Sequence, residues 1–472
     1  MNGFTPILLA AALAGGSAQA AKPALDDRAL ATATTLRDQG TSGTGAYEIV
    51  ASLTTEVGPR LAGTPAFDRA VEWAQAKFKA LGYDRVYLEP VTFPQWQRRH
   101  ESGSVLSPHP QPLALTALGG SVGTDGHAIE AEVVEFANLT ALSAAPAGSL
   151  DGKIAYISNR MQRARDGSGY GPAVAARRSG ASEAAKKGAL AVLIRSIGTD
   201  SDRLPHTGMM QYTDGVAKIP AAAVSNPDAD LLSRMIRDGQ PVRVRLDLDV
   251  GWTGASITSY NVIGEIRGRE KPDEVVVIGG HLDSWDLGTG AIDDGAGVAI
   301  TMAAGAMIGK LERAPRRTIR VIAFCNEEQG LYGGKAYAET HKAELDLQQL
   351  GAESDFGAGR IYAFSAGASA QAQPAIQQIA KVLAPLEIVS LIATDKGDPG
   401  PDIGPFAKLG MPWAQLSQDG TNYFDWHHTA NDTLDKIEPK ALDQQAAAYA
   451  VLAYLAADSR IDFGHSPPAA SP

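Results

Sequence analysis

The sequence is poor in cysteine, with Cys325 the single one among 472 residues. No intramolecular disulfide can form, and metal sites built from several thiolates are excluded. Positive charge is also scarce, because 42 Lys and Arg residues stand against 53 Asp and Glu residues, a formal net charge of −11. This balance argues against nucleic acid or a membrane surface as a partner. Any bound metal ion must therefore be held by His, Asp and Glu side chains.

Long apolar runs are absent as well, and no segment after the N-terminus is apolar enough to cross a bilayer. The N-terminus has an apolar run over residues 7–13, followed by Ala18-Gln19-Ala20, a pattern typical of a secretory signal. No Lys or Arg precedes this run, so a buried N-terminal helix is the alternative. We expect residues 1–20 to be a signal peptide and the protein to be secreted or periplasmic.

Three catalytic motifs are also missing: the Gly-x-Ser-x-Gly elbow, the His-Glu-x-x-His helix and the phosphate loop. Their absence removes the sequence support for a serine hydrolase of the elbow type, a helix-based zinc protease or a kinase. Cys325 lies in an apolar segment and is most simply a small buried residue rather than a nucleophile.

A length of 472 residues predicts two or three domains. Helical spacing of apolar residues predicts helices over residues 46–60 and 65–84 and, more broadly, a mainly helical region 25–95. Short strand-like runs dominate residues 125–250, with one helix expected from an N-cap at Ser182 to a stop at Gly188. We therefore divide the chain into segments: 21–124 (first part of the catalytic domain), 125–252 (inserted β-rich domain) and 253–472 (metal-binding core).

From residue 257 onward, strand-like and helical segments alternate. This alternation predicts an α/β fold, a mixed sheet flanked by helices on both faces. A strand is expected over residues 386–393, and a long helix over residues 439–459. In sheets of this kind the active site lies where the strands end.

Acidic and imidazole side chains follow several of the predicted strands. Carboxylates crowded in one cleft repel one another by several kcal/mol unless a cation neutralises them. A shell of His, Asp and Glu without thiols suits zinc, with cobalt or manganese as alternatives. We therefore expect a shared metal site formed from these clusters: His281 with Asp283, Asp293 with Asp294, Glu327 with Glu328, Glu353 with Asp355, and His427 with His428.

Spacing within two of the clusters suggests roles. His281 and Asp283 are two residues apart on a strand and so face the same side. Asp283 is better placed to orient the imidazole than to bind metal. Glu327 and its neighbour Glu328 diverge, so that one can bind metal while the other reaches a water molecule.

The segments GGHLDSWDLGTGAIDDGAG (279–297), CNEEQGLYGG (325–334), ESD (353–355) and HHTANDT (427–433) resemble, in this order, the di-zinc aminopeptidase/glutamate carboxypeptidase family. GPRLAGT (58–64) and HTGMMQYTDGVAKIP (206–220) extend the likeness over essentially the whole mature chain. The resemblance implies the zinc-peptidase fold, with an inserted protease-associated domain. It also implies two zinc ions per chain, a peptide substrate and a possible homodimer.

Carried over by motif, the resemblance assigns the site residues. It favours His428 over His427 because His428 begins the pattern His-Thr-x-x-Asp-Thr. The peptide bond between Asp293 and Asp294 is expected to be cis. The roles implied are His281 and Asp355 on one zinc ion, Glu328 and His428 on the other, Asp293 bridging both, and Glu327 as the general base.

Two further residues have open roles. Tyr423 could donate to the oxyanion of the reaction or simply pack. His206 could support a turn or reach the substrate cleft. The resemblance favours dipeptides or short peptides with a free N-terminus as substrates. The alternatives are a broader aminopeptidase acting on longer peptides, a single-zinc glutaminyl cyclase-like enzyme, and a non-catalytic binding protein.

Overall fold

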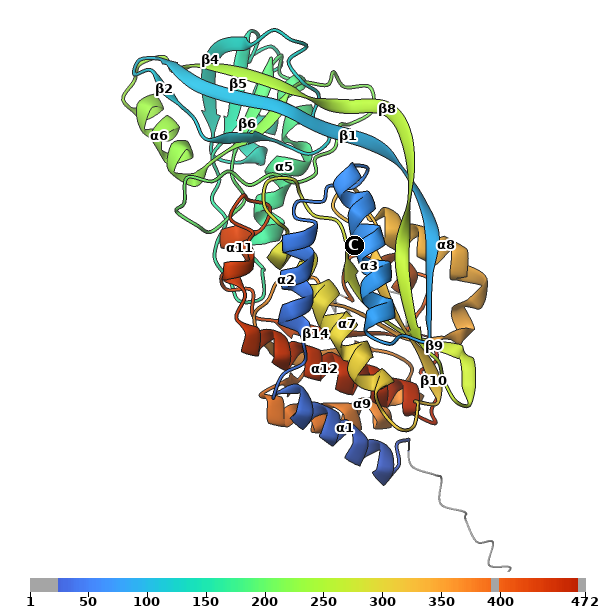
Figure 1. Ribbon diagram of the computed structural model, residues 1–472. Helices are drawn as coiled ribbons and strands as arrows, with labels where there is room; N and C mark the ends of the chain where they lie inside the picture. The colour runs from blue at the N-terminus through green and yellow to red at the C-terminus, as the bar shows by residue number, and fades with distance from the viewer. Residues whose placement is uncertain (1–23, 392–398, 466–472) are drawn as a thin grey trace, which may run out of the picture.

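The computed structural model describes residues 24–391 and 399–465. The predicted signal segment, residues 1–20, lies outside the described residues. The described chain forms two lobes that share one mixed sheet of 14 strands (Figure 1). The lobes are joined along one side by two long antiparallel strands, β1 (Arg85–Ser107) and β8 (Arg243–Ile266). The predicted α/β class, a mixed sheet flanked by helices, is confirmed.

The lower lobe is built on parallel strands that are buried on both faces. β10 pairs with β9 in parallel, β9 pairs with β11, and every residue of β10 is buried. Strands of this kind require helices on both sides of the sheet. One face is covered by α7 and α12, with α1, α2 and α9 packed against these helices, and the other face is covered by α8 and α10. The strands are β9 (Lys271–His281), β10 (Arg317–Phe324), β11 (Gln348–Glu353), β12 (Ile361–Gly367), β13 (Val389–Ser390) and β14 (Trp413–Gln418).

The helices of the lower lobe follow the apolar periodicity of the sequence. Helices predicted over residues 46–60, 65–84 and 439–459 are confirmed as α2, α3 and α12. The expectation that no segment after the N-terminus is apolar enough to cross a bilayer is wrong for Ala291–Gly309, which has the length and composition of a membrane span. Because 94% of its apolar window is buried inside the protein, it has the character of a core helix. The helices are α1 (Asp27–Gly40), α2 (Ala46–Glu56), α3 (Pro65–Ala80), α7 (Ala296–Gly309), α8 (Tyr332–His341), α9 (Gln373–Leu383), α10 (Gly404–Ala407), α11 (Tyr423–Trp426) and α12 (Pro439–Asp458), with short turns η1 (Ala291–Gly295), η2 (Lys342–Leu347), η3 (Ala370–Ala372), η4 (Ala384–Leu386) and η5 (Leu434–Lys436).

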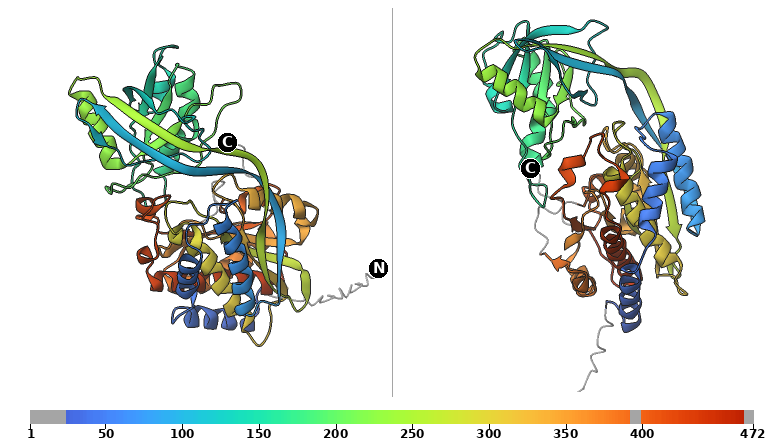
Figure 2. Two further views of the ribbon diagram at one scale, coloured as in Figure 1. Left: turned by 45° about the horizontal axis from the view of Figure 1, so that its top comes forward. Right: turned by 60° about the vertical axis from the view of Figure 1, so that its left-hand side comes forward.

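The second lobe, which we call the cap, continues the sheet beyond β8 in the order β4-β5-β6-β7-β3. One face of its sheet packs into an apolar cluster that includes Trp96, Tyr156 and Leu246, and the other face, with Ile157 and Ile194, joins the main core. Figure 2 shows the cap leaning over the lower lobe, with α5 directed toward it. Its elements are β2 (Gln111–Pro112), β3 (Leu115–Ala117), β4 (Ile129–Phe136), β5 (Lys153–Ile157), β6 (Ala191–Arg195), β7 (Ala221–Val224), α4 (Leu139–Ser143), α5 (Tyr170–Ala185) and α6 (Asn226–Arg237), with the outer ends of β1 and β8.

The region 25–95 is mainly helical, as predicted, with α1, α2 and α3, although β1 begins at Arg85 and pairs with β8. Two local predictions are wrong. Ser182 is not an N-cap, because α5 starts twelve residues earlier, at Tyr170, and Ser182 is buried within it. Of the strand expected over 386–393, only Val389–Ser390 forms β13, and residues 392–393 lie outside the described part.

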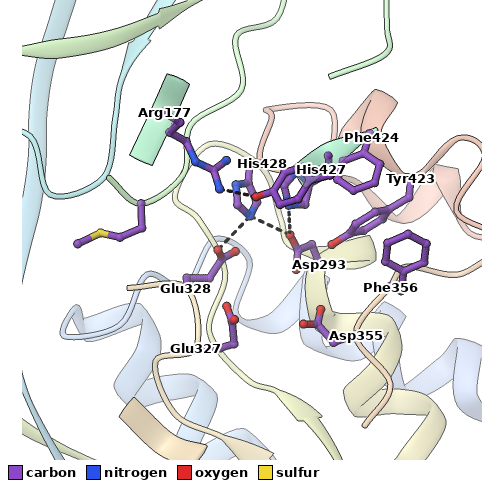
Figure 3. A pocket seen from close by; sticks show the side chains of 12 residues that line it. Arg177, Asp293, Glu327, Glu328, Asp355, Phe356, Tyr423, Phe424, His427 and His428 are labelled. Carbon is purple, nitrogen blue, oxygen red and sulfur yellow. Dashed lines mark hydrogen bonds and ion pairs between the residues drawn. The ribbon is translucent and has the colours of Figure 1, made fainter. Parts of the chain in front are cut away.

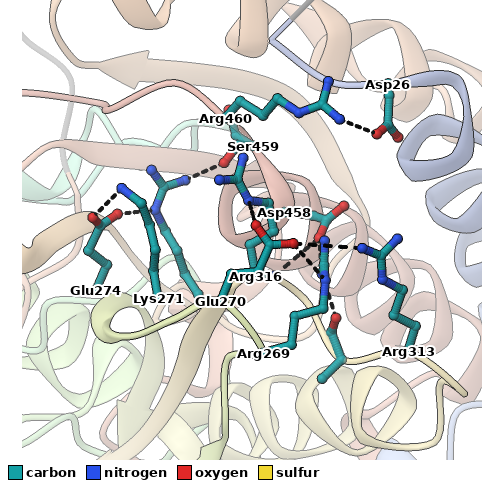
Figure 4. Close-up of polar contacts among 12 residues, drawn as sticks. Asp26, Arg269, Glu270, Lys271, Glu274, Arg313, Arg316, Asp458, Ser459 and Arg460 are labelled. Carbon is teal, nitrogen blue, oxygen red and sulfur yellow. Dashed lines mark hydrogen bonds and ion pairs between the residues drawn. The ribbon is translucent and has the colours of Figure 1, made fainter.

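At the opposite end of the lower lobe, charged side chains connect the chain ends to the sheet (Figure 4). Arg460 lies 2.9 Å from the carboxylate of Asp26, the N-cap of α1. Arg316 lies 2.8 Å from Glu270. These contacts lie mostly at the surface, where an ion pair contributes at most about 1 kcal/mol. The side chains that could carry out chemistry therefore lie at the other end of the lobe, at the carboxyl ends of the strands.

Candidate metal centre and pocket

The chemistry-bearing residues of the lower lobe gather at the carboxyl ends of neighbouring parallel strands. His281 is the last residue of β9, Glu327 and Glu328 follow β10, and Asp355 follows β11. Because β9, β10 and β11 are parallel neighbours, these ends meet at the same edge. Three further residues reach this edge from loops and turns: Asp293 in η1 before α7, and His427 and His428 after α11.

Asp293 lies at the centre of two groups of side chains (Figure 3). Its Oδ1 lies 3.0 Å from Nε2 of His281, and its Oδ2 lies 3.2 Å from Nε2 of His428. His281 is also 3.5 Å from Asp355, and His428 is 3.0 Å from Glu328. The peptide bond between Asp293 and Asp294 is cis, as expected. The arrangement is that of two ligand sets that share one carboxylate.

Asp283 is completely buried and supports three of these residues. Nδ1 of His281 lies 3.0 Å from the backbone oxygen of Asp283 and 3.6 Å from its carboxylate. The carboxylate instead accepts the backbone N–H groups of Glu327 at 3.0 Å and Glu328 at 3.3 Å. The closest contact to the imidazole therefore comes from the backbone of Asp283, and its side chain positions the glutamate pair.

Two buried residues that the sequence reasoning did not assign hold the loop that carries Asp293. Asp432 accepts the backbone N–H of Ile292 at 2.6 Å and that of Asp293 at 3.2 Å. Arg60 donates to the backbone oxygens of Leu282, Thr289 and Gly290. Arg60 lies in the motif GPRLAGT and Asp432 in HHTANDT, but the spacing of residues in these motifs does not predict the contacts.

The protein groups alone leave this cluster short of positive charge. Burial raises the pKa of Glu327 and Asp355, and neighbouring acids add to the effect despite the opposing charge of His281. Among the described residues, Oε1 of Glu328 is buried without a hydrogen-bond partner, and Oδ2 of Asp293 faces the imidazoles of His428 at 3.2 Å and His427 at 3.6 Å. Several buried carboxylates, two imidazoles and an acceptor atom without a donor fit a site for divalent cations.

His427 stacks on His428 with ring centroids 3.5 Å apart, and its Nε2 lies 3.6 Å from Asp293. Burial lowers the pKa of His427, and His428 lowers it further. His428 instead has a pKa raised to about 9, since the Glu328 and Asp293 carboxylates outweigh the effect of burial. The stronger carboxylate contacts thus belong to His428.

A cavity of about 260 Å³ opens directly onto these carboxylates. Arg177 of α5 enters it from the cap and is 6% exposed, and sequence reasoning gave no signal for this residue. Tyr423 lines the cavity, with its phenol directed toward Asp293 (Figure 3). The lining residues are Tyr170, Arg177, Met209, Asp293, Glu327, Glu328, Asp355, Phe356, Tyr423, Phe424, His427 and His428.

His206 is buried beside this cavity and is not among the lining residues that the structure describes. Its Nδ1 lies 2.7 Å from the backbone oxygen of His427, and its Nε2 lies 2.7 Å from Asp200. Both ring nitrogens are thus engaged, which fits the supporting alternative rather than direct contact with substrate.

The fold and the His and carboxylate cluster at the strand ends are those of an α/β metallopeptidase. Residues 261–453 match the model of peptidase family M28. Carboxypeptidase Q from Bos taurus is 37% identical over 412 residues, which cover 87% of this chain and 85% of the relative. The protein from Homo sapiens is 36% identical over the same shares. The chain belongs to peptidase family M28.

Solved structures agree with this assignment. The peptidase M28 precursor from Shewanella amazonensis is 51% identical, with a TM-score of 0.91, covering 94% of this chain and 100% of that one. A zinc aminopeptidase from Bacillus subtilis shares the fold, with 22% identity, a TM-score of 0.62 and coverage of 89% of this chain and 98% of that one. The predicted family and the peptidase class of enzyme are confirmed.

Proposed function

We propose that this peptidase is a zinc-dependent exopeptidase that hydrolyses dipeptides or short peptides, with two zinc ions per chain. The observation that carries the proposal is the pair of ligand sets joined by Asp293 at the floor of a small cavity. The cavity lies just below the range of about 300–1,000 Å³ usual for small-molecule sites, which favours short substrates. We further propose a signal peptide over residues 1–20, export from the cytoplasm and a homodimer.

We infer that the cap includes an inserted protease-associated domain, residues 125–252, between catalytic segments 21–124 and 253–472. The outer end of β1 with β2 and β3, which belong to the first of these segments, completes the cap. An apolar cluster whose residues lie mostly in the cap supports this division. The strand β8 passes without a break through the boundary at residue 252, so the two domains share a continuous β-ribbon. This continuous ribbon supports a fixed position of the cap relative to the lower lobe.

In this proposal the residues around Asp293 hold the metal ions, with His281 and Asp355 on one, Glu328 and His428 on the other, and Asp293 on both. When bound, such a pair of zinc ions lowers the pKa of water and polarises the scissile carbonyl. Asp283 keeps Glu327 and Glu328 in their relative positions through their backbone N–H groups.

Glu327 is the general base of the proposed reaction. Its carboxylate lines the cavity beside the residues that hold the metal ions, where it can accept a proton from water and release it again. It takes the proton from the attacking water and delivers it to the nitrogen of the leaving amine. Tyr423 faces the same space and is placed to donate to the oxyanion.

Arg177 supports a substrate with a free C-terminal carboxylate. Its guanidinium donates to the Tyr170 hydroxyl and, at 3.3 Å, to the Thr207 backbone oxygen, while its buried Nε has no acceptor among the described residues. Two divalent ions balance the four carboxylates that line the cavity, so the charge of Arg177 is left for a substrate anion. Arginine matches a carboxylate in planar, two-point geometry.

The test of the base is Glu327→Gln. We expect peptide hydrolysis to be lost while zinc content stays near two ions per chain, measured by atomic emission on the purified variant. Retention of wild-type turnover contradicts the role of Glu327. Loss of metal would mean that the roles of Glu327 and Glu328 are exchanged.

The test of substrate class compares dipeptides, dipeptide amides and N-terminally blocked dipeptides. We expect the wild type to prefer free dipeptides, and Arg177→Met to reduce kcat/KM for them about 100-fold while changing the amides less. Efficient trimming of longer peptides from the N-terminus would instead support the broader aminopeptidase. One zinc ion per chain with pyroglutamate formation would support the cyclase-like alternative, and intact ligand binding without hydrolysis would support a binding protein.

A further inference from the structure

The end of the cavity opposite Arg177 is aromatic. Phe356 lies 5.0 Å from Tyr423 and 5.9 Å from Phe424, measured between ring centroids. Figure 3 shows Phe356 and Tyr423 on the far side of Asp293 from Arg177. The cavity therefore has a cationic end and an apolar end, with the carboxylates between them.

Phe356 is held in place by two glycines on different lobes. A methyl group at Gly167, in the cap, would lie 2.6 Å from Cζ of Phe356. A methyl group at Gly420, in the loop before α11, would lie 2.0 Å from its Cε1. Both contacts are closer than carbon atoms can approach, so the ring fills the space that these glycines leave. The apolar end is thus assembled jointly by the cap and the lower lobe.

Polar contacts fix the cap segment that carries Gly167. Arg163 donates to both carboxylate oxygens of Asp425, at 2.6 and 2.9 Å. Arg165 donates to Asp419 at 2.9 Å. Asp419 and Asp425 flank Gly420 and Tyr423 in the sequence, so these arginines dock the cap on the loop that forms the aromatic wall.

We propose that Phe356 is a specificity-determining residue that sets the size of the subsite for the N-terminal side chain of the substrate. The inference rests on the proposed function: with the C-terminal carboxylate on Arg177 and the scissile bond near Asp293, the N-terminal residue lies at the aromatic end. The aromatic end of the cavity favours apolar side chains. Because the Phe356 ring is in contact with Gly167 and Gly420, it cannot move away from a larger substrate side chain.

The experiment compares wild type and Phe356→Ala on Gly-Ala, Leu-Ala and Trp-Ala, with both proteins loaded with zinc. Removal of the Phe356 ring should reduce kcat/KM for Leu-Ala about 10-fold, because the leucine side chain loses its contact. The ratio of kcat/KM for Trp-Ala to that for Leu-Ala should rise by about 10-fold. Gly-Ala has no N-terminal side chain, so its kcat/KM should change by less than about threefold. Ala-Leu and Ala-Trp, which vary the other residue, should keep their wild-type ratio.

Tyr332→Ala is the matched control, because Tyr332 is a half-buried aromatic residue that packs on Phe93 and is not among the described lining residues. It should leave all the ratios unchanged. An equal fall for all substrates of Phe356→Ala, Gly-Ala included, would show that Phe356 only supports Asp355 and would overturn the proposal. So would a change that follows the C-terminal residue. If the wild type cleaves none of these dipeptides, the proposed function itself fails.

Discussion

Arg60 offers a sharp test of how the loop before Asp293 is held. Its side chain is fully buried, and its guanidinium donates closely to three backbone oxygens, those of Leu282, Thr289 (2.7 Å) and Gly290 (2.8 Å), and at 3.5 Å to that of Gly58. Arg60→Met keeps a similar volume and removes these donors. Replacing the arginine leaves three carbonyl groups without these donors and nearby carboxylates without a buried countercharge.

We expect Arg60→Met to reduce the free energy of unfolding by about 3–5 kcal/mol, the usual cost of breaking a buried charged network. Urea unfolding of the zinc-loaded proteins measures this difference, and kcat/KM should fall with it because Asp293 loses its support. The free energy of unfolding of Arg60→Lys should lie between those of the wild type and Arg60→Met, since one ammonium group cannot reach three carbonyl groups at once. A loss below about 1 kcal/mol for Arg60→Met would refute the idea that this side chain holds the loop.

Three other outcomes follow from the structure. Asp432→Asn should cost about 1–3 kcal/mol, seen by urea unfolding, because Ile292 or Asp293 loses its acceptor. His341 has a pKa raised above 6.5: burial opposes the shift, but hydrogen bonds to Glu89 and Glu344 outweigh it. Its contribution is therefore present below pH 6.5 and is lost as pH rises through the folded-state pKa, so the stability advantage over His341→Gln should shrink toward pH 9. Chelation of zinc should abolish hydrolysis and speed amide hydrogen exchange first in residues 279–297.

The fold was predictable where local pattern and burial agree. The helix α12 carries apolar residues all round and is buried along most of its length, and β9 and β10 are apolar runs between covered faces. The ribbon of β1 and β8 was harder, because much of it is half exposed and β1 contains Pro90 and Pro94. Such strands are specified by pairing with each other over a long sequence separation, and a local window does not contain that information.

The site was predictable to the extent that its residues sit at strand ends. The alternation of strands and helices places His281, Glu328 and Asp355 at one edge without any knowledge of distances. Arg60 and Arg177 could not be found in this way. Each acts from a segment remote in sequence, and a buried arginine in a loop or in a helix has the same local pattern as an exposed one.

The two lobes bring opposite charges to the cavity. The lower lobe supplies the carboxylates, and the cap segment over residues 163–177 supplies Arg163, Arg165 and Arg177. Arg163 forms an ion pair with Asp425, and Arg165 forms one with Asp419. Both pairs are half exposed, so each contributes about 1 kcal/mol or less to stability. Arg177 alone is buried in the cavity. The weak contacts of Arg163 and Arg165 thus position the cap segment that carries Arg177. Substitutions of Arg163 or Arg165 should therefore alter substrate affinity more than the stability of either lobe.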